Sequence, residues 1–209
     1  GLGDVYKRQQ RSPSIIMVVG VGGAGGNAVN HMWNMGIKGV DFMVCNTDQQ
    51  ALDKSPVELK IRLGNEGLGA GNDPENGRRA AIDSLDEVRC RFEASGTKML
   101  FITAGMGGGT GTGAAPVIAR IAHDMGILTV GVVTKPFSFE GKRKMGLAEQ
   151  GIANLLMHVD SLIVIPNERL KMISQEKITL MNAFQAADNV LRQGVESISA
   201  LINVCLLYT

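Results

Sequence analysis

Glycine-rich segments contain most of the residues of this chain that could do chemistry. Residues 105–113, Gly-Met-Gly-Gly-Gly-Thr-Gly-Thr-Gly, separate an apolar run at 99–103 from a helical pattern that starts at 114. Such a turn leaves backbone N–H groups free at a helix N-terminus, where the helix dipole also favours an anion. Glycine lets a phosphate approach the backbone, because no side chain stands in the way. The segment predicts a phosphate-binding turn rather than a hinge, with the hydroxyls of Thr110 and Thr112 as additional donors.

A second glycine-rich segment, Gly20–Asn27, follows another apolar run and satisfies G-x-G-x-x-G at Gly20, Gly22 and Gly25. In this strand-to-helix context the pattern is typical of a dinucleotide-binding unit. Asp48 lies about 20 residues further on, where such a unit places the acid that binds the ribose. An NAD(P)-binding Rossmann oxidoreductase domain is therefore the alternative hypothesis, although it leaves the richer glycine segment unexplained.

Other function classes are disfavoured by missing patterns. The sequence contains no G-x-x-x-x-G-K-[ST] phosphate loop and no Asn-Lys-x-Asp guanine motif. The net charge of +1 and the lack of a basic patch argue against a nucleic-acid partner. No apolar run is long enough to insert into a membrane. The scattered cysteines and histidines show no metal-ligand spacing, so no metal-binding residues are predicted, and the three cysteines suit a reducing cytosol.

Apolar runs alternate with helical patterns along the whole chain, which predicts an α/β fold. Strands are expected near 15–19, 40–45, 59–63, 98–103, 127–133 and 160–165, and helices near 25–35, 74–93, 113–124, 141–158 and 178–203. This alternation implies a doubly wound, mainly parallel, Rossmann-like sheet with helices on both faces, ending in a long core helix. Ligands of such sheets bind beyond the carboxyl ends of the strands, where the glycine segments fall. Asp73 and Pro74, after a glycine-rich loop at 64–73, are a typical helix start.

Several separated motifs together resemble the tubulin/FtsZ family of GTPases, and in particular its bacterial cell-division branch. They are Val18–Ala28, Cys45–Asp48, Gly67–Gly71, Thr134–Gly141 and Ala183–Val190, with Gly107–Gly113 as the family signature. The resemblance runs from about Ile15 to Val204. It implies one GTP-binding domain over 10–204, and we expect 1–9 and 205–209 to be non-native sequence.

The resemblance also implies a function. Members bind GTP or GDP with Mg²⁺ and assemble head to tail into cytoplasmic filaments at the mid-cell division site. An acidic loop of the next subunit completes hydrolysis, and a C-terminal tail binds other division proteins. We expect that loop, the second domain and the tail to lie beyond Thr209. No catalytic residue is therefore assigned within this chain, and little turnover is expected from it alone.

The family's nucleotide contacts can be transferred to matching positions. Backbone N–H groups of two segments would hold the phosphates: Gly22, Gly23, Ala24, Gly25, Gly26, Asn27, Gly107, Gly108, Gly109, Thr110 and Gly111. Ala70 and Gly71 lie in the loop that closes over the terminal phosphate, and Glu140 and Asn167 contact the ribose. Asn27 and Asn46 also contact the nucleotide, and Lys144 stands where the family often has arginine.

The guanine base would be bound by Phe184 and Asp188. These residues lie four apart on one helix face, so the ring can stack on the base while the carboxylate accepts two hydrogen bonds from it. Spacing alone favours an ordinary core phenylalanine beside a solvated aspartate. The family resemblance is what assigns both residues to the base.

Overall fold

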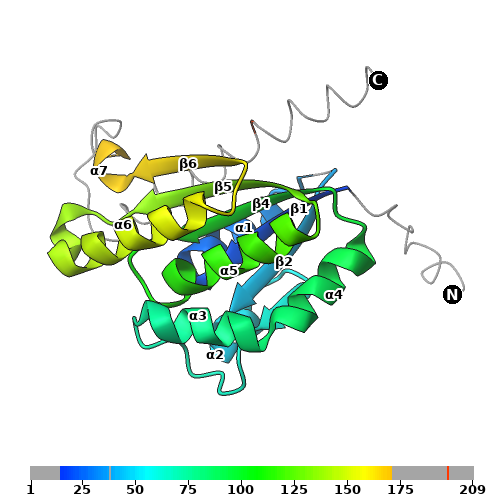
Figure 1. Ribbon diagram of the computed structural model, residues 1–209, viewed down its shortest axis with the longest axis horizontal. Helices are drawn as coiled ribbons and strands as arrows, with labels where there is room; N and C mark the ends of the chain where they lie inside the picture. The colour runs from blue at the N-terminus through cyan, green and yellow to red at the C-terminus, as the bar shows by residue number, and fades with distance from the viewer. Residues whose placement is uncertain (1–14, 38, 171–196, 198–209) are drawn as a thin grey trace, which may run out of the picture.

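Six parallel strands form a single sheet in the order β3-β2-β1-β4-β5-β6 (Figure 1). This computed structural model describes residues 15–37, 39–170 and 197. The strands are β1 (Ile16–Val21), β2 (Asp41–Asn46), β3 (Leu59–Arg62), β4 (Met99–Gly105), β5 (Leu128–Lys135) and β6 (Ser161–Pro166). Each predicted strand is present with its ends shifted by at most two residues, and the predicted doubly wound parallel sheet is confirmed.

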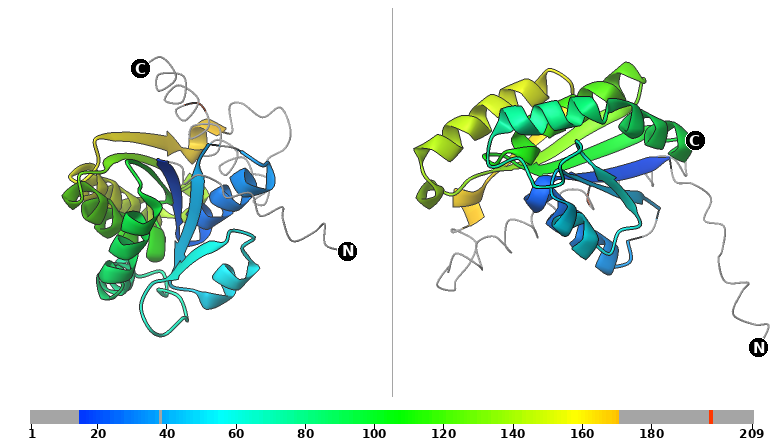
Figure 2. Two further views of the ribbon diagram at one scale, coloured as in Figure 1. Left: turned by 90° about the vertical axis from the view of Figure 1, so that its right-hand side faces the viewer. Right: turned by 90° about the horizontal axis from the view of Figure 1, so that it is seen from below.

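Helices cover both faces of the sheet and create two separate apolar cores. On one face lie α1 (Gly22–Asn34) and α2 (Gln49–Lys54); on the other lie α3 (Pro74–Asp83), α4 (Leu85–Ser95), α5 (Thr110–Asp124) and α6 (Lys142–Leu156) (Figure 2). The short helices η1 (Ser138–Glu140) and α7 (Asn167–Leu170) follow β5 and β6. Because both faces are covered, the central strands are apolar throughout rather than alternating.

The central strand β1 shows how the two cores are divided. Met17 and Val19 are fully buried beneath α5, whereas Ile16 and Val18 are fully buried beneath α1. Alternate side chains of a strand point to opposite faces, so each core takes every second residue. β1 pairs with β2 on one side and with β4 on the other.

Two helices begin earlier than the sequence predicts. The first, expected at 25–35, begins at Gly22 directly after β1, and the third, expected at 113–124, begins at Thr110. Glycine has low helix propensity, so residue type alone does not predict a helix there. Close backbone packing overrides that propensity, because a Cβ on Gly25 would overlap the carbonyl of Thr103.

The predicted helix at 74–93 is in fact two helices, separated at Ser84. The Ser84 hydroxyl accepts a hydrogen bond from the N–H of Gly64 at 2.9 Å, which ties the break to the start of the glycine-rich loop. The expected start at Asp73 is confirmed, since its side chain accepts the N–H of Glu75 at 2.9 Å. The predicted helix at 178–203 lies outside the described residues. Among the described helices, none has the length and apolar character to cross a membrane.

Candidate functional site

The main cavity of the described chain lies beyond the carboxyl ends of the strands and has a volume of about 460 Å³. Its lining comes from the loops after β1, β2, β4, β5 and β6, together with the glycine-rich loop at 64–73. The sheet order places β1 beside β4, and the direction of winding reverses between them. The two glycine segments follow these two strands, so the fold brings them together at the point where doubly wound sheets bind ligands.

The glycines of the first segment divide into packing and cavity positions. A Cβ on Gly20 would overlap the carbonyl of Gly25, so these two positions allow α1 to pack tightly on the sheet. Gly23 differs, because a Cβ there would meet nothing within 4 Å and the residue lines the cavity. No side chain caps the start of α1, which leaves its first N–H groups available for an anion.

The second segment has the same division. Gly107 has φ +114°, a conformation that disfavours a side chain, and its N–H donates to the Thr112 hydroxyl at 2.8 Å. A Cβ on Gly109 would lie 2.7 Å from the Cβ of Ala70, so the segment packs against the loop at 64–73. Gly108 lines the cavity with open space around it. The 15-residue α5 begins here without a side-chain cap, so its free N–H groups and helix dipole are directed at the cavity.

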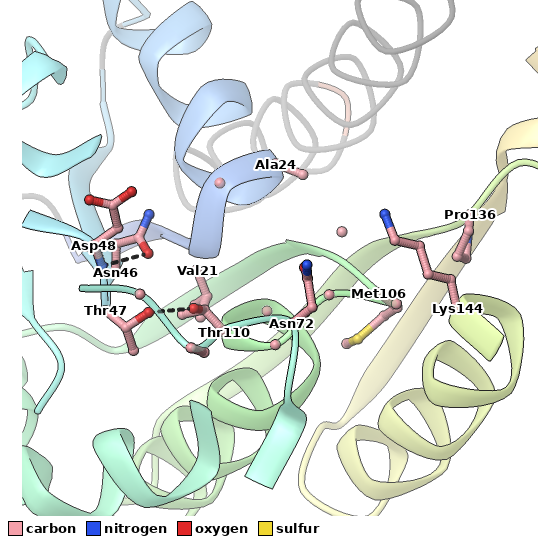
Figure 3. A pocket seen from close by; sticks show the side chains of 18 of the residues that line it. Val21, Ala24, Asn46, Thr47, Asp48, Asn72, Met106, Thr110, Pro136 and Lys144 are labelled. Atoms are coloured by element: carbon pink, nitrogen blue, oxygen red, sulfur yellow. Dashed lines mark hydrogen bonds between the residues drawn. The ribbon is translucent and has the colours of Figure 1, made fainter. Parts of the chain in front are cut away.

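One of the two predicted hydroxyl donors has a different role. Thr112 is 3% exposed, and its hydroxyl accepts the N–H of Gly107 inside the turn. Thr112 does not line the cavity, so the structure does not support the prediction that it donates to a ligand; its oxygen instead holds the turn together. Thr110 does line the cavity, and its hydroxyl lies 2.6 Å from that of Thr47 (Figure 3).

The loop after β2 forms one wall of the cavity. Asn46 accepts a hydrogen bond from the N–H of Asp48 at 3.2 Å through its side-chain oxygen (Figure 3). The Asp48 carboxylate caps α2 by accepting the N–H groups of Gln50 and Ala51. Asp48, on which the dinucleotide-binding alternative was based, therefore serves as the N-cap of α2.

The opposite wall combines an ion pair and a buried amide. Lys144 on α6 directs its amine into the cavity (Figure 3), and its Nζ lies 3.4 Å from Glu140 Oε1. Glu140 also accepts the N–H of Phe137 at 2.8 Å, which fixes the carboxylate at the rim. Asn167 is 4% exposed, and its Oδ1 has no hydrogen-bond partner in the described part of the chain.

Most of the predicted nucleotide contacts line this one cavity. They are Gly23, Ala24, Asn46, Ala70, Gly71, Gly107, Gly108, Gly109, Thr110, Gly111, Glu140, Lys144 and Asn167. Gly22, Gly26 and Asn27 line a neighbouring cavity of about 230 Å³, which shares Gly23, Asn46, Asp48 and Ala51 with the first. Gly25 lines neither cavity and serves for packing. Phe184 and Asp188 lie outside the described residues.

Sequence reasoning missed several lining residues. Thr47, Asn72, Met106, Thr134 and Pro136 all border the main cavity. All five stand within two residues of a strand end or of an already assigned glycine, and that position was the available signal. Asn72 has φ +58°, a rare conformation for a residue other than glycine, which the sequence does not indicate.

The chemistry available in the cavity is that of anion binding. Lys144 is the only cationic side chain among the described residues that line it, beside two carboxylates, Asp48 and Glu140. The described residues include no cluster of three or more His, Cys, Asp or Glu side chains suited to a metal ion. Cys45 is no candidate nucleophile, because burial raises the pKa of its thiol to about 12.

Comparisons with known proteins agree with this geometry. The sequence profile described as Tubulin/FtsZ family, GTPase domain, matches residues 15–175. The chain is 57% identical over 190 residues to the cell division protein FtsZ of Rhizobium radiobacter, an alignment that covers 90% of this chain and 32% of that protein. It is 54% identical over 194 residues to the FtsZ of Wigglesworthia glossinidia brevipalpis, covering 91% and 50%. The chain thus spans between a third and a half of the length of these relatives.

Solved structures show the same relationship. An empty FtsZ dimer of M. jannaschii matches with a TM-score of 0.86 and 44% identity, covering 93% of this chain and 56% of that one. A GTPγS-bound protofilament of CetZ2 from Haloferax volcanii matches with a TM-score of 0.78 and 22% identity, covering 88% and 58%, which is a likeness of fold. The profile match over most of its length shows that this chain belongs to the tubulin/FtsZ family, whose GTPase domain it contains.

Proposed function

We propose that this chain binds GTP in the main cavity and is part of a GTPase that assembles head to tail into filaments for cell division. The observation that carries the proposal is the meeting of two glycine segments at the β1–β4 switch point, around one cavity of about 460 Å³. Family membership selects GTP over other phosphate ligands, and neither the structure nor the comparisons favour an oxidoreductase.

The phosphates would be bound mainly by backbone. Free N–H groups at the starts of α1 and α5 point to the same cavity, and Gly23 and Gly108 leave space for close approach. Such donors need no rearrangement when the ligand arrives, because the packing of Gly20, Gly25 and Gly109 already fixes the turns.

Charge neutralisation requires more than these dipoles. A nucleoside triphosphate carries several negative charges, and the described lining offers one cation, Lys144, already paired with Glu140. Mg²⁺ bound to the phosphates would supply the missing charge while keeping most of its water ligands. The hydroxyls and carbonyls of the cavity suit such a hydrated ion, which needs no dedicated carboxylate cluster.

The ribose would lie against the wall that contains Glu140 and Asn167. Glu140 and Asn167 stand at the rim of the main cavity, and Asn27 lines the neighbouring one. The unpartnered Oδ1 of Asn167 is suited to accept a ribose hydroxyl. Phe184 would stack on the base, and the Asp188 carboxylate would accept the guanine N1–H and N2–H₂ groups.

The relatives support the proposed assembly and location. Those with the higher identities are named cell division proteins, and a solved relative is a dimer. We propose that this protein likewise self-associates head to tail, in the cytoplasm at the division site, with hydrolysis completed by an acidic loop of the neighbouring subunit. Other division proteins would bind through a C-terminal tail.

The test is competition binding of GTP, ATP, NADH and xanthosine triphosphate to the 209-residue chain with Mg²⁺. Wild type should prefer GTP. Asp188→Asn should have a lower affinity for GTP and a higher affinity for xanthosine triphosphate. The asparagine amide can donate to the xanthine 2-carbonyl, which replaces the guanine amino group. Preference for NADH, or an unchanged order of affinities in Asp188→Asn, would contradict the proposal.

A further inference from the structure

The Thr47–Thr110 contact has features that the nucleotide contacts above do not use. The two hydroxyl oxygens lie 2.6 Å apart and come from different loops, 63 residues apart in sequence. Thr47 is 4% exposed, on the loop after β2, and Thr110 begins α5 in a half-buried position. Both line the main cavity (Figure 3).

The Thr47–Thr110 contact leaves one hydroxyl proton free for a ligand. Each hydroxyl has one proton, and one of the two protons is used in the bond between them. The other proton remains available for a ligand. Thr110 stands at the helix N-terminus where an anion is favoured, whereas Thr47 is nearly buried. The arrangement that serves a phosphate has Thr47 donating to Thr110, and Thr110 donating into the cavity.

The backbone of Thr47 makes a second connection. Its carbonyl accepts the N–H of Gly69 at 3.1 Å, beside a two-residue bridge between Asp48 and Leu68. The N–H of Gln49 donates to the carbonyl of Gly67 at 3.0 Å. The glycine-rich loop is therefore attached to the β2 loop along its middle, and Thr47 is the attached residue that also contacts α5.

Thr47 also stands between two cavities. It lines the main cavity and, with Gly69, a second one of about 270 Å³ that lies behind the glycine-rich loop. The same loop packs against the phosphate segment at Ala70, whose Cβ would lie 2.7 Å from a Cβ on Gly109. A displacement of Thr110 by a ligand would thus reach the loop by two routes, the packing of Gly109 on Ala70 and the side chain and backbone of Thr47.

We infer that Thr47 is a positioning residue of the phosphate site: its hydroxyl directs the Thr110 proton to the ligand, and its carbonyl connects ligand binding to the order of residues 64–71. The inference rests on the proposed function, because it needs a phosphate at Thr110. It assigns Thr47 no direct contact with the reacting atoms.

The experiment compares Thr47→Ala, Thr47→Ser and the matched control Thr97→Ala in the full chain. Thr97 is 5% exposed, its hydroxyl has no partner in the described chain, and it lines none of the cavities above. Two quantities are measured: the affinity for GTP, and the hydrogen-exchange protection of residues 64–71 that GTP induces. Thermal unfolding establishes that each variant is folded.

Thr47→Ala should bind GTP about three- to tenfold more weakly, because the Thr110 hydroxyl keeps its proton but loses the hydrogen bond that orients it toward the ligand. Its GTP-induced protection at 64–71 should fall, although the carbonyl bond to Gly69 remains possible. Thr47→Ser should restore both, because serine keeps the hydroxyl, and Thr97→Ala should change neither.

The two proposals fail in different ways. If wild type does not bind GTP, the proposed function and this inference both fall. If wild type binds GTP and folded Thr47→Ala matches it in affinity and protection, only the inference is overturned. If Thr47→Ala does not fold, the Ser variant decides, since weak binding with a retained hydroxyl would equally overturn the role of the proton.

Discussion

Gly113 on α5 lies against the backbone carbonyl of Pro74, the first residue of α3, with no room for a side chain between the two helices. An added Cβ would also stand 2.7 Å from the backbone nitrogen of Arg78. Both obstacles are backbone atoms of a helix, which cannot move aside as a side chain can. The contact sets the separation of the two helices that flank the cavity, since α3 follows the glycine-rich loop and α5 begins at the phosphate segment.

Gly113→Ala should therefore destabilise the fold by about 2–3 kcal/mol through overpacking. Urea unfolding followed by circular dichroism measures the change in the free energy of unfolding. Gly146→Ala is the control, because Gly146 lies in α6 with open space around it, and alanine there should stabilise the helix by about 0.5–1 kcal/mol. Equal stabilities of the two variants would contradict the packing argument.

Gly108→Ala should separate ligand binding from folding. A Cβ at this position meets no atom within 4 Å and φ is unexceptional, so the free energy of unfolding should change by less than about 0.5 kcal/mol. The methyl group would occupy the space a phosphate needs, and GTP affinity should drop by about tenfold or more. Calorimetric titration on a variant with wild-type stability provides the measurement. Unchanged affinity would place the phosphates elsewhere.

Lys144→Ala should weaken GTP binding, by about 1 kcal/mol since the side chain is partly exposed and already paired with Glu140. The loss should shrink at high salt, because screening weakens exposed charges. Lys144→Arg should bind at least as well as wild type, since guanidinium keeps the charge and adds a fork of donors. Arg143→Ala removes the same charge one residue away, outside the described lining, and serves as the control. Equal losses in both alanine variants would indicate a general charge effect.

Thiol labelling should distinguish the two described cysteines. Cys90 is exposed and should react promptly with a disulfide reagent at neutral pH, whereas buried Cys45 should react only after unfolding. Burial raises the pKa of Cys45 from 9.0 to about 12. Its contribution to stability is therefore complete below pH 9 and is lost between about pH 9 and 12, as the unfolded thiol ionises first.

The labelling should be done in a Cys205→Ser background, so that Cys45 and Cys90 are the thiols available to the reagent. Cys45→Ala should flatten the alkaline part of the stability profile, measured as the free energy of unfolding against pH. Prompt labelling of Cys45 in the folded protein would mean that β2 opens more readily than its burial suggests.

The sequence was sufficient for the sheet and for most of the cavity. Buried parallel strands are short continuous apolar runs, and all six were located to within two residues. The glycine segments were recognisable because each stands between such a run and a helix. The apolar runs and glycine segments are local sequence patterns, so they can be recognised without knowledge of the tertiary contacts.

The features that the sequence did not predict depend on tertiary contacts, on the geometry of a turn or on very short helices. Helix α1 begins among glycines because tight packing of Gly25 on Thr103 outweighs low helix propensity. The break at Ser84 depends on its bond to Gly64, and the role of Thr112 depends on the N–H of Gly107. The short helices α2 and α7 are below the length at which periodicity is informative.

All six strands point the same way, so the residues around the cavity come from loops scattered from Val21 to Asn167. An unfolded chain has no such enclosure and no affinity for the ligand. Under the proposed function, a bound nucleotide would stabilise the whole fold: at a hundred times its dissociation constant it would add about 2.7 kcal/mol to the free energy of unfolding. A cell that keeps its nucleotide pool full would thereby protect this protein from proteolysis, and starvation would expose it.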